Sequence, residues 1–378
     1  MTPLTVADLA RKYALYPHCL SALVKATQDL GIRGVPRMAG QSNSGWMEEA
    51  LIAIVQAQQV RAIADHLANS ECTEMATDIR KLDQEWTRET DVGIIVPTAE
   101  EFRQLQPDLE RLSAIPRRDD ATGRHDYLFG YPSGGAAYRV AAALIGDMGP
   151  TQAAVATDQF IGRRNPRCIV VLGIAAAIDD DVTLGDVVVG THVNNYLEKA
   201  KVVPSETGFE FIAAGEPFRC NDALTQSIRD LEFAHPDNFK GWQSLSRQCR
   251  ATTVPEDAYT RLARKGHVRE APQSFGGPIA CGPVVSAASE FLRWVKSINR
   301  KYLALEMESG GALAAVYSRL TPAAAVVLRG ISDFGDQRKK MIDKIAKGAL
   351  RVYAMRNVVH LLWAVLDAGL LPRSAHNG

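Results

Sequence analysis

Short apolar runs that end at polar or small residues recur along most of the chain and predict buried strands. The runs 91–96, 168–172 and 323–328 are rich in Val, Ile, Leu and Ala, and they stop at Pro, Gly and Arg respectively. Runs that are apolar throughout, without alternation, are typical of parallel strands covered on both faces. Segments with helical spacing lie between them, so the pattern predicts an α/β fold.

The first ninety residues show helical spacing instead. The spacing continues on both sides of a turn near Pro17, and this outline resembles a helix-turn-helix. The stretch 46–67 predicts one long amphipathic helix. We therefore expect a small all-α domain over 1–88 and a larger domain over 89–378. The all-α domain suits oligomerisation or sensing, and DNA binding is the alternative, although five cations against two acids in the first forty residues make a weak DNA footprint.

Acidic side chains follow several of the predicted strands. Asp333 comes shortly after the run 323–328, the segment 306–308 reads Glu-Met-Glu after a short apolar run, and Glu101 follows the run 91–96. Ligands of open α/β sheets bind at the carboxyl ends of strands, so we expect these acids near a ligand. Each acid also has a local structural explanation. Asp333 suits a turn, Glu306 and Glu308 suit the N-terminus of a helix, where they interact with its dipole, and Glu101 suits a capping box with Thr98.

A second kind of signal is a strand followed by small residues. Cys168 to Leu172 leads into Gly173 to Ala177, which we interpret as a turn, and a further strand follows Gly185. Small side chains allow backbone to approach a ligand closely.

In this order, the segments resemble the nucleoside phosphorylase and nucleosidase superfamily, most closely its methylthioadenosine/S-adenosylhomocysteine nucleosidase type. The resemblance runs from about residue 91 to the C-terminus and rests mainly on 306–308 and on Arg329, Ser332 and Asp333. It implies a three-layer α/β sandwich with a mixed central sheet. It also implies hydrolysis of the N-glycosidic bond of a purine nucleoside or nucleotide, without metal or organic cofactor.

The resemblance also implies a role for each matching residue. Asp333, positioned by Ser332, is the expected general acid that protonates the departing purine, and Glu101 is expected to activate water. Glu308 would hold the ribose hydroxyls, and Met307 would pack on the sugar. The expected substrate-binding set also includes Glu306, Gly173, Ile174, Ala175, Val285, Arg338 and Lys339.

Two departures from the family bear on the nucleophile and on the substrate. Val171 and Ile174 stand where phosphorylases of the family carry phosphate-binding Arg and Ser, which favours water as the nucleophile. A phosphate-dependent phosphorylase is the enzymatic alternative.

The cluster 338–340 (Arg-Lys-Lys) is either a solvated helix start or a clamp for a 5′-phosphate. Similar domains act as bacterial anti-phage effectors, which would imply cleavage of ATP-type nucleotides. A DNA-binding regulator that only senses a nucleoside is a further alternative.

Composition excludes several other classes. The formal net charge is zero, which gives no global attraction to nucleic acid or membranes, and the six Cys show no zinc or disulfide spacing. The apolar segment 357–371 is interrupted by charge and too short for a bilayer, so it predicts a packing helix. The polar region 204–278 predicts an insertion over the pocket or at a subunit contact. Because no signal segment opens the sequence, we expect a cytoplasmic location. We also expect a homo-oligomer.

Overall fold

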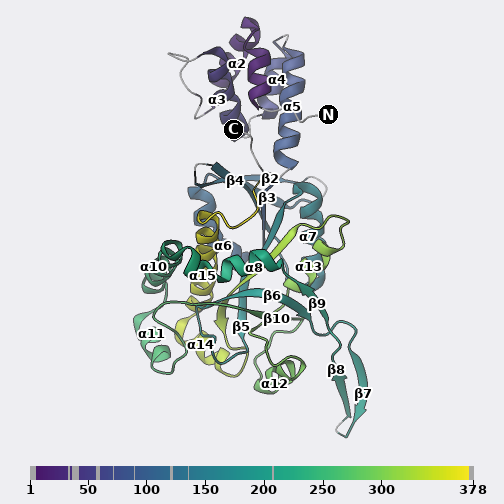
Figure 1. Ribbon diagram of the computed structural model, residues 1–378, viewed down its shortest axis with the longest axis vertical. Coiled ribbons are helices and arrows are strands. Elements are labelled where there is room, and N and C mark those ends of the chain that lie inside the picture. The colour runs from purple at the N-terminus through teal and green to yellow at the C-terminus, as the bar shows by residue number, and fades with distance from the viewer. Residues whose placement is uncertain are drawn as a thin grey trace. The chain divides into compact units, whose positions relative to one another are not determined.

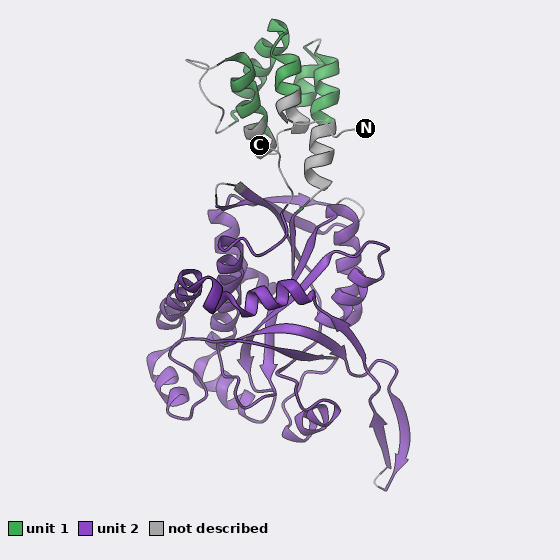
Figure 2. Cartoon of the chain, viewed as in Figure 1, with its two compact units in different colours: residues 1–90 green, residues 91–378 purple. Residues whose placement is uncertain are grey.

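Two compact units make up the structure, which is a computed structural model. They span Met1–Thr90 and Asp91–Gly378, and Figure 2 shows each in its own colour. The structure describes residues 6–32, 35, 42–56, 60–70, 72–88, 90–119, 122–134, 136–206 and 208–373.

The first unit is helical and has a core of its own. Leu23, Met47 and Ile63, from three different helices, are fully buried together. The predicted helix, short turn and second helix are confirmed, with Pro17 in the first helical turn, where its missing N–H needs no partner. The single helix predicted over 46–67 corresponds to two helices, and residues 57–59 between them lie outside the described residues. The helices are α1 (Val6–Tyr13), α2 (Pro17–Asp29), α3 (Asn43–Gln56), α4 (Val60–Ala68) and α5 (Thr73–Arg88).

The second unit is built on a mixed sheet, shown in Figure 1. The three apolar runs predicted as strands are strands β1, β5 and β12, and they pair in parallel. The strands are β1 (Val92–Val96), β2 (Ile115–Arg118), β3 (His125–Ser133), β4 (Ala136–Leu144), β5 (Cys168–Ala177), β6 (Val187–Asn195), β7 (Lys201–Ser205), β8 (Gly208–Ile212), β9 (Glu216–Arg219), β10 (Ser274–Cys281), β11 (Ala304–Glu306) and β12 (Ala324–Asp333).

Strand pairing brings the ends of several strands together. The order across the sheet is β11-β10-β6-β12-β5-β1-β4-β3-β2, with β9 beside β6, and β11 also pairs with β5. The strands β5, β12, β6, β10 and β11 therefore close on themselves. Two predicted turns are strand instead: β12 continues past Leu328 to Asp333, and β5 continues through Gly173 to Ala177, because both segments keep pairing with each other.

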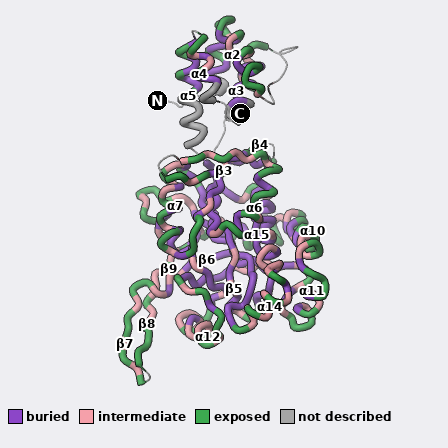
Figure 3. The backbone as a smooth tube through the Cα atoms, turned by 180° about the vertical axis from the view of Figure 1, so that it is seen from behind, coloured by how far each residue is buried: buried purple, intermediate pink, exposed green. Residues whose placement is uncertain are grey.

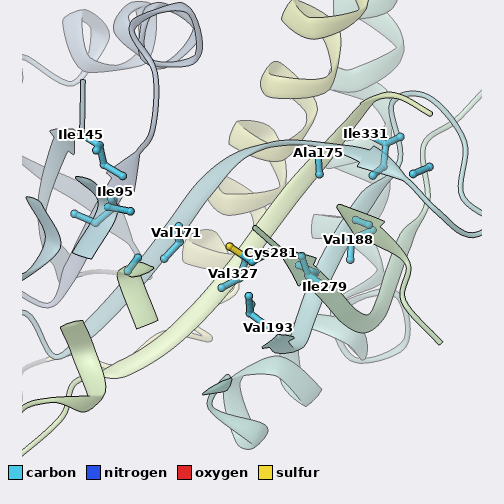
Figure 4. Packing of buried hydrophobic residues seen from close by; sticks show 14 of the residues in the cluster. Ile95, Ile145, Val171, Ala175, Val188, Val193, Ile279, Cys281, Val327 and Ile331 are labelled. Carbon is cyan, nitrogen blue, oxygen red and sulfur yellow. The ribbon is translucent and has the colours of Figure 1, made fainter. Parts of the chain in front are cut away.

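Helices cover both faces of the sheet. Along β5, Val171 packs in one apolar cluster with residues of α7 and α13, whereas its neighbour Val170 packs in a second cluster with residues of α6 and α15. Figure 4 shows part of the first cluster around Val171. Burial on both faces explains why the strands are apolar throughout. The predicted α/β fold with a mixed sheet behind a helical N-terminal part is confirmed. The helices are α6 (Ala99–Arg111), α7 (Pro150–Arg164), α8 (Asp222–Arg229), α9 (Leu231–Ala234), α10 (Pro236–Thr253), α11 (Glu256–Ala263), α12 (Ser289–Ile298), α13 (Ser309–Tyr317), α14 (Arg338–Ala346) and α15 (Ala349–Asp367).

Two peripheral predictions have different outcomes. The C-terminal segment is the buried helix α15, which packs on the sheet and on α6 and α10, as predicted. The region 204–278 contains most of an exposed β7–β8 hairpin that projects from the unit, as Figures 1 and 3 show, together with α8 to α11. None of its described residues lines the cavity at the carboxyl ends of β5, β11 and β12, so the region does not cover that pocket, and the subunit contact stays a prediction. In the described part of the chain, no helix combines the length and the apolar character that a bilayer crossing needs.

Candidate active site

A cavity of about 260 Å³ lies at the carboxyl ends of β5, β11 and β12. The start of α6 and one side of α15 complete its wall. Ligands of open α/β sheets bind in such positions. Residues of the predicted site that line the cavity are Glu101, Ile174, Ala175, Val285, Glu306, Met307, Glu308, Ser332, Asp333 and Lys339.

An irregularity in β12 explains how two consecutive residues reach the same cavity. The register against β5 shifts between Ile331 and Asp333, which leaves Ser332 as an extra residue. Successive side chains of a regular strand point to opposite faces, whereas a bulge re-aims them. Both Ser332 and Asp333 consequently line the cavity although each is buried.

Asp333 is surrounded by hydrogen-bond donors. Its Oδ1 accepts from the Gly335 N–H at 2.8 Å, and its Oδ2 accepts from the Ser332 hydroxyl at 3.1 Å. The Lys339 ammonium lies 3.1 Å from the same Oδ2 and forms an ion pair with it. These contacts fix the carboxyl group at the cavity wall and place a second proton-bearing group directly beside it.

Glu101 combines a structural contact with a position in the cavity. Its carboxylate accepts from the Thr98 N–H at 3.0 Å, and the Thr98 hydroxyl caps the Glu101 N–H in return, so the predicted capping box is present. The other oxygen accepts from the Ile174 N–H at 2.8 Å, which ties α6 to β5. Burial raises the pKa of Glu101, although the nearby Arg329 guanidinium opposes the rise.

Arg329 lies behind the cavity, fully buried among acids. Its guanidinium forms an ion pair with Glu306 and donates to the Ser309 hydroxyl at 2.8 Å, and Glu308 lies 3.8 Å away. Within the described residues, its Nε and Nη1 have no hydrogen-bond partner. A Cβ placed on Gly173 would lie 1.9 Å from Nη1, so close approach of the arginine accounts for this glycine.

Glu308 is the least compensated acid of this group. It is buried at the N-terminus of α13 and accepts from the Gly149 N–H at 3.3 Å. Burial, with the charge of Glu306 close by, raises its pKa to about 7 in spite of the opposing Arg329. Glu306, in contrast, accepts from the Glu308 and Ser309 N–H groups and from Arg329, so its carboxylate is already engaged within the protein.

The basic residues differ from the predicted arrangement. Arg338 does not line the cavity: its guanidinium pairs with Asp336 at 2.8 Å and lies over the Phe334 ring at 4.0 Å. The start of α14 at Arg338 directs this side chain back onto the preceding turn. Lys339 reaches the cavity but pairs with Asp333, so the predicted three-residue phosphate clamp is not assembled around the cavity.

Two arginines had no role assigned from the sequence. Arg329 belongs to the motif of Arg329, Ser332 and Asp333, yet only its contacts with Glu306 and Glu308 reveal its position among the acids. Arg351 lines the cavity from α15, where it lies 3.6 Å from Glu100, and no sequence signal distinguishes it from other helix-surface arginines.

Fold and cavity together define a class: α/β sandwiches that bind a small molecule where their strands end. The chain belongs to the phosphorylase superfamily, whose family model matches residues 91–362. The match lies within the second unit and does not include the helical unit.

Solved structures support this fold. The chain is similar to the 5′-methylthioadenosine/S-adenosylhomocysteine nucleosidase of Colwellia psychrerythraea in complex with adenine, with 19% identity, a TM-score of 0.52, and coverage of 75% of this chain and 96% of that chain. It is also similar to the Streptococcus pneumoniae nucleosidase of the same name in complex with 8-aminoadenine, with 18% identity, a TM-score of 0.51, and coverage of 74% and 99%. A search of curated protein sequences found no match. At these identities the similarity shows a shared fold.

Proposed function

We propose that this protein hydrolyses the N-glycosidic bond of a purine nucleoside, with water as the nucleophile. The observation that carries the proposal is that Asp333 and the acids grouped around Arg329 line one cavity, at the strand ends of a phosphorylase-superfamily fold. The bases bound in the two similar structures, adenine and 8-aminoadenine, support a purine as the leaving group.

The departing base requires a proton. When the bond between the sugar and the purine breaks, its electron pair leaves with the base, and protonation of a ring nitrogen neutralises the developing charge. We assign this proton transfer to Asp333, with Ser332 and Gly335 holding its carboxyl group in position. General acid catalysis of this kind contributes roughly 10²–10⁴-fold to the rate. Lys339, in contact with Asp333, is placed to replenish that proton.

We assign activation of the attacking water to the acids grouped around Arg329. The water oxygen attacks the anomeric carbon, and Glu101 accepts its proton. Arg329, buried behind the cavity, supplies the counter-charge for these acids. Glu308, once ionised, stabilises the positive charge that develops on the sugar and accepts from the ribose hydroxyls. Met307 packs on the sugar.

Charge also favours water over phosphate. The acids Glu101, Glu306 and Glu308 share one guanidinium, Arg329, so a phosphate dianion would approach an excess of negative charge. Ile174, at a position that binds phosphate in phosphorylases, donates its N–H to Glu101 instead.

The test uses purified full-length protein. Adenosine, methylthioadenosine, inosine, AMP and ATP are incubated with it, with and without phosphate, and free base and sugar products are separated by chromatography. We expect free base and a reducing sugar, unchanged by phosphate, and none with Asp333→Asn. A sugar 1-phosphate product would establish the phosphorylase alternative, and absence of base release from every compound would contradict the proposal.

Several narrower predictions from sequence accompany this proposal. They are cleavage of ATP-type nucleotides in an antiviral defence role, a cytoplasmic location, assembly as a homo-oligomer, and a sensor, oligomerisation or DNA-binding role for residues 1–88. The AMP and ATP arms of the assay test the first of these directly.

A further inference from the structure

Three potential metal ligands meet inside the helical unit. The Cys19 and Cys72 sulfurs and a ring nitrogen of His18 all lie within 4.8 Å of one another. Both cysteines are buried and His18 is exposed. Among the residues that the structure describes, no other group of three or more His, Cys, Asp or Glu side chains is arranged in this way.

Local structure holds the three residues in place. His18 and Cys19 lie in the first turn of α2, which begins at Pro17. Cys72 directly precedes α5: its N–H donates to the Leu67 carbonyl at 3.0 Å, and its own carbonyl accepts from the Ala76 N–H at 2.9 Å. The ligands therefore sit on two helix starts with a fixed backbone.

The contacts of these thiols distinguish them from the other cysteines. Cys168, Cys220 and Cys281 are buried in the second unit and belong to no such group. Cys19 instead hydrogen-bonds Cys72. A single buried cysteine can serve as a small apolar residue. Packing alone does not explain why two thiols are directed at each other beside an imidazole.

We propose that the helical unit binds a thiophilic divalent metal ion of the Zn²⁺ class through Cys19, Cys72 and His18. Thiolate and imidazole are the ligands such ions prefer, at about 2.3 Å for sulfur and about 2.0–2.1 Å for nitrogen. Ligand atoms around a tetrahedral ion lie closer together than the present upper limit of 4.8 Å, so a modest contraction completes the site. Because His18 is exposed, the fourth position faces solvent and takes water. Binding releases the thiol protons.

Such an ion would connect the start of α2 to the start of α5. These helices are far apart in sequence, so the site forms only in the folded unit and metal binding stabilises that fold. The proposal does not depend on the reaction at the second unit, and its test needs no activity measurement.

The experiment uses the full chain, reduced and stripped of metal with a chelator, and titrated with Co²⁺ under anaerobic conditions. We expect one Co²⁺ per chain, a thiolate-to-cobalt charge-transfer band, and loss of both signals when Zn²⁺ is added. Cys19→Ser and Cys72→Ser should each remove the charge-transfer band. His18→Ala should weaken Co²⁺ affinity at least as much as the loss of a supporting residue does, by roughly 10–100-fold.

Matched controls separate ligand loss from unfolding. His66→Ala removes another imidazole of the same unit, and Cys249→Ser removes a partly buried thiol of the second unit; both should leave the titration unchanged. Circular dichroism of each variant confirms that it is folded. Absence of a cobalt signal from folded wild type would overturn the proposal, as would a signal that survives both cysteine substitutions. Peptide mapping that finds a Cys19–Cys72 disulfide in protein that never retains metal would identify a redox pair instead.

Discussion

Replacing Glu308 by glutamine should change stability and activity in opposite directions as pH rises. Burial and the neighbouring Glu306 raise the pKa of Glu308 from its ordinary value of 4.5 to about 7. A shift of this size corresponds to about 3 kcal/mol between the two protonation states. Near neutral pH the folded protein therefore holds Glu308 in both states.

The sign for stability follows from proton binding. Between about pH 4.5 and 7 the folded protein keeps the Glu308 proton, whereas the unfolded chain has released it. The folded state binds more protons there, so this contribution is fully present at low pH and is lost as pH rises through about 7. Glutamine cannot ionise and is isosteric. Relative to wild type, Glu308→Gln should gain stability by up to about 3 kcal/mol at about pH 8 and little at about pH 5.

The sign for activity is the reverse. In the proposed mechanism ionised Glu308 stabilises positive charge on the sugar, so base release by wild type should increase as pH rises through about 7. The Glu308→Gln variant should be slower and should lose this limb of the pH profile.

The assay pairs urea unfolding at the two pH values with base release across the same range. Glu100→Gln is the matched control, because Glu100 also lines the cavity but its side chain is 51% exposed. An equal stability difference between Glu308→Gln and wild type at both pH values would refute the raised pKa. If base release by Glu308→Gln still increases as pH rises through about 7, another group causes that increase.

Other substitutions test the remaining parts of the site. Asp333→Asn should lower base release by at least about 10²-fold with an unchanged circular dichroism spectrum; near-normal turnover would remove it from the mechanism. Lys339→Met should slow base release without abolishing substrate binding measured by calorimetry, if it only supplies protons to Asp333. Arg329→Met leaves buried acids without their counter-charge and should cost about 3–5 kcal/mol in urea unfolding. Gly173→Ala forces a Cβ against Arg329 and should cost about 1–3 kcal/mol and most of the activity, whereas Gly241→Ala, with open space around its Cβ, should cost neither.

The sequence predicted the structure best for segments that are buried on both faces, because such segments allow only one interpretation. The apolar runs that became β1, β5 and β12 are covered on both faces, and few structures other than a central strand can bury such a run completely. Glu101 and Asp333, which follow β1 and β12, could then be predicted to lie together, because parallel strands deliver their carboxyl ends to one edge; Glu308 instead follows β11, which pairs antiparallel to β5. Glu101, Glu308 and Asp333 do line a common cavity.

The sequence did not predict features that depend on the direction of a side chain or on pairing between segments far apart in the chain. The turns predicted at Gly173 and before Asp333 are strand, since small and polar residues can still pair, and the β12 bulge depends on register. Arg338 precedes Lys339 by one residue, and the helix start sends one side chain away from the cavity and the other into it. Cys19 and Cys72 are brought together only by helix packing.

Charge at the cavity favours a neutral nucleoside over a nucleotide. Acids outnumber bases among its lining residues, and both lining bases are already engaged: Lys339 with Asp333, and Arg351 with Glu100 and Asp343. A phosphate chain would have to break these pairs and approach further acids, at about 4 kcal/mol per like-charge pair at 4 Å in a protein-surface environment. A neutral nucleoside meets no such cost. It becomes positive on the sugar only in the transition state, so the same acids stabilise the transition state more than the bound substrate, which is the condition for raising turnover.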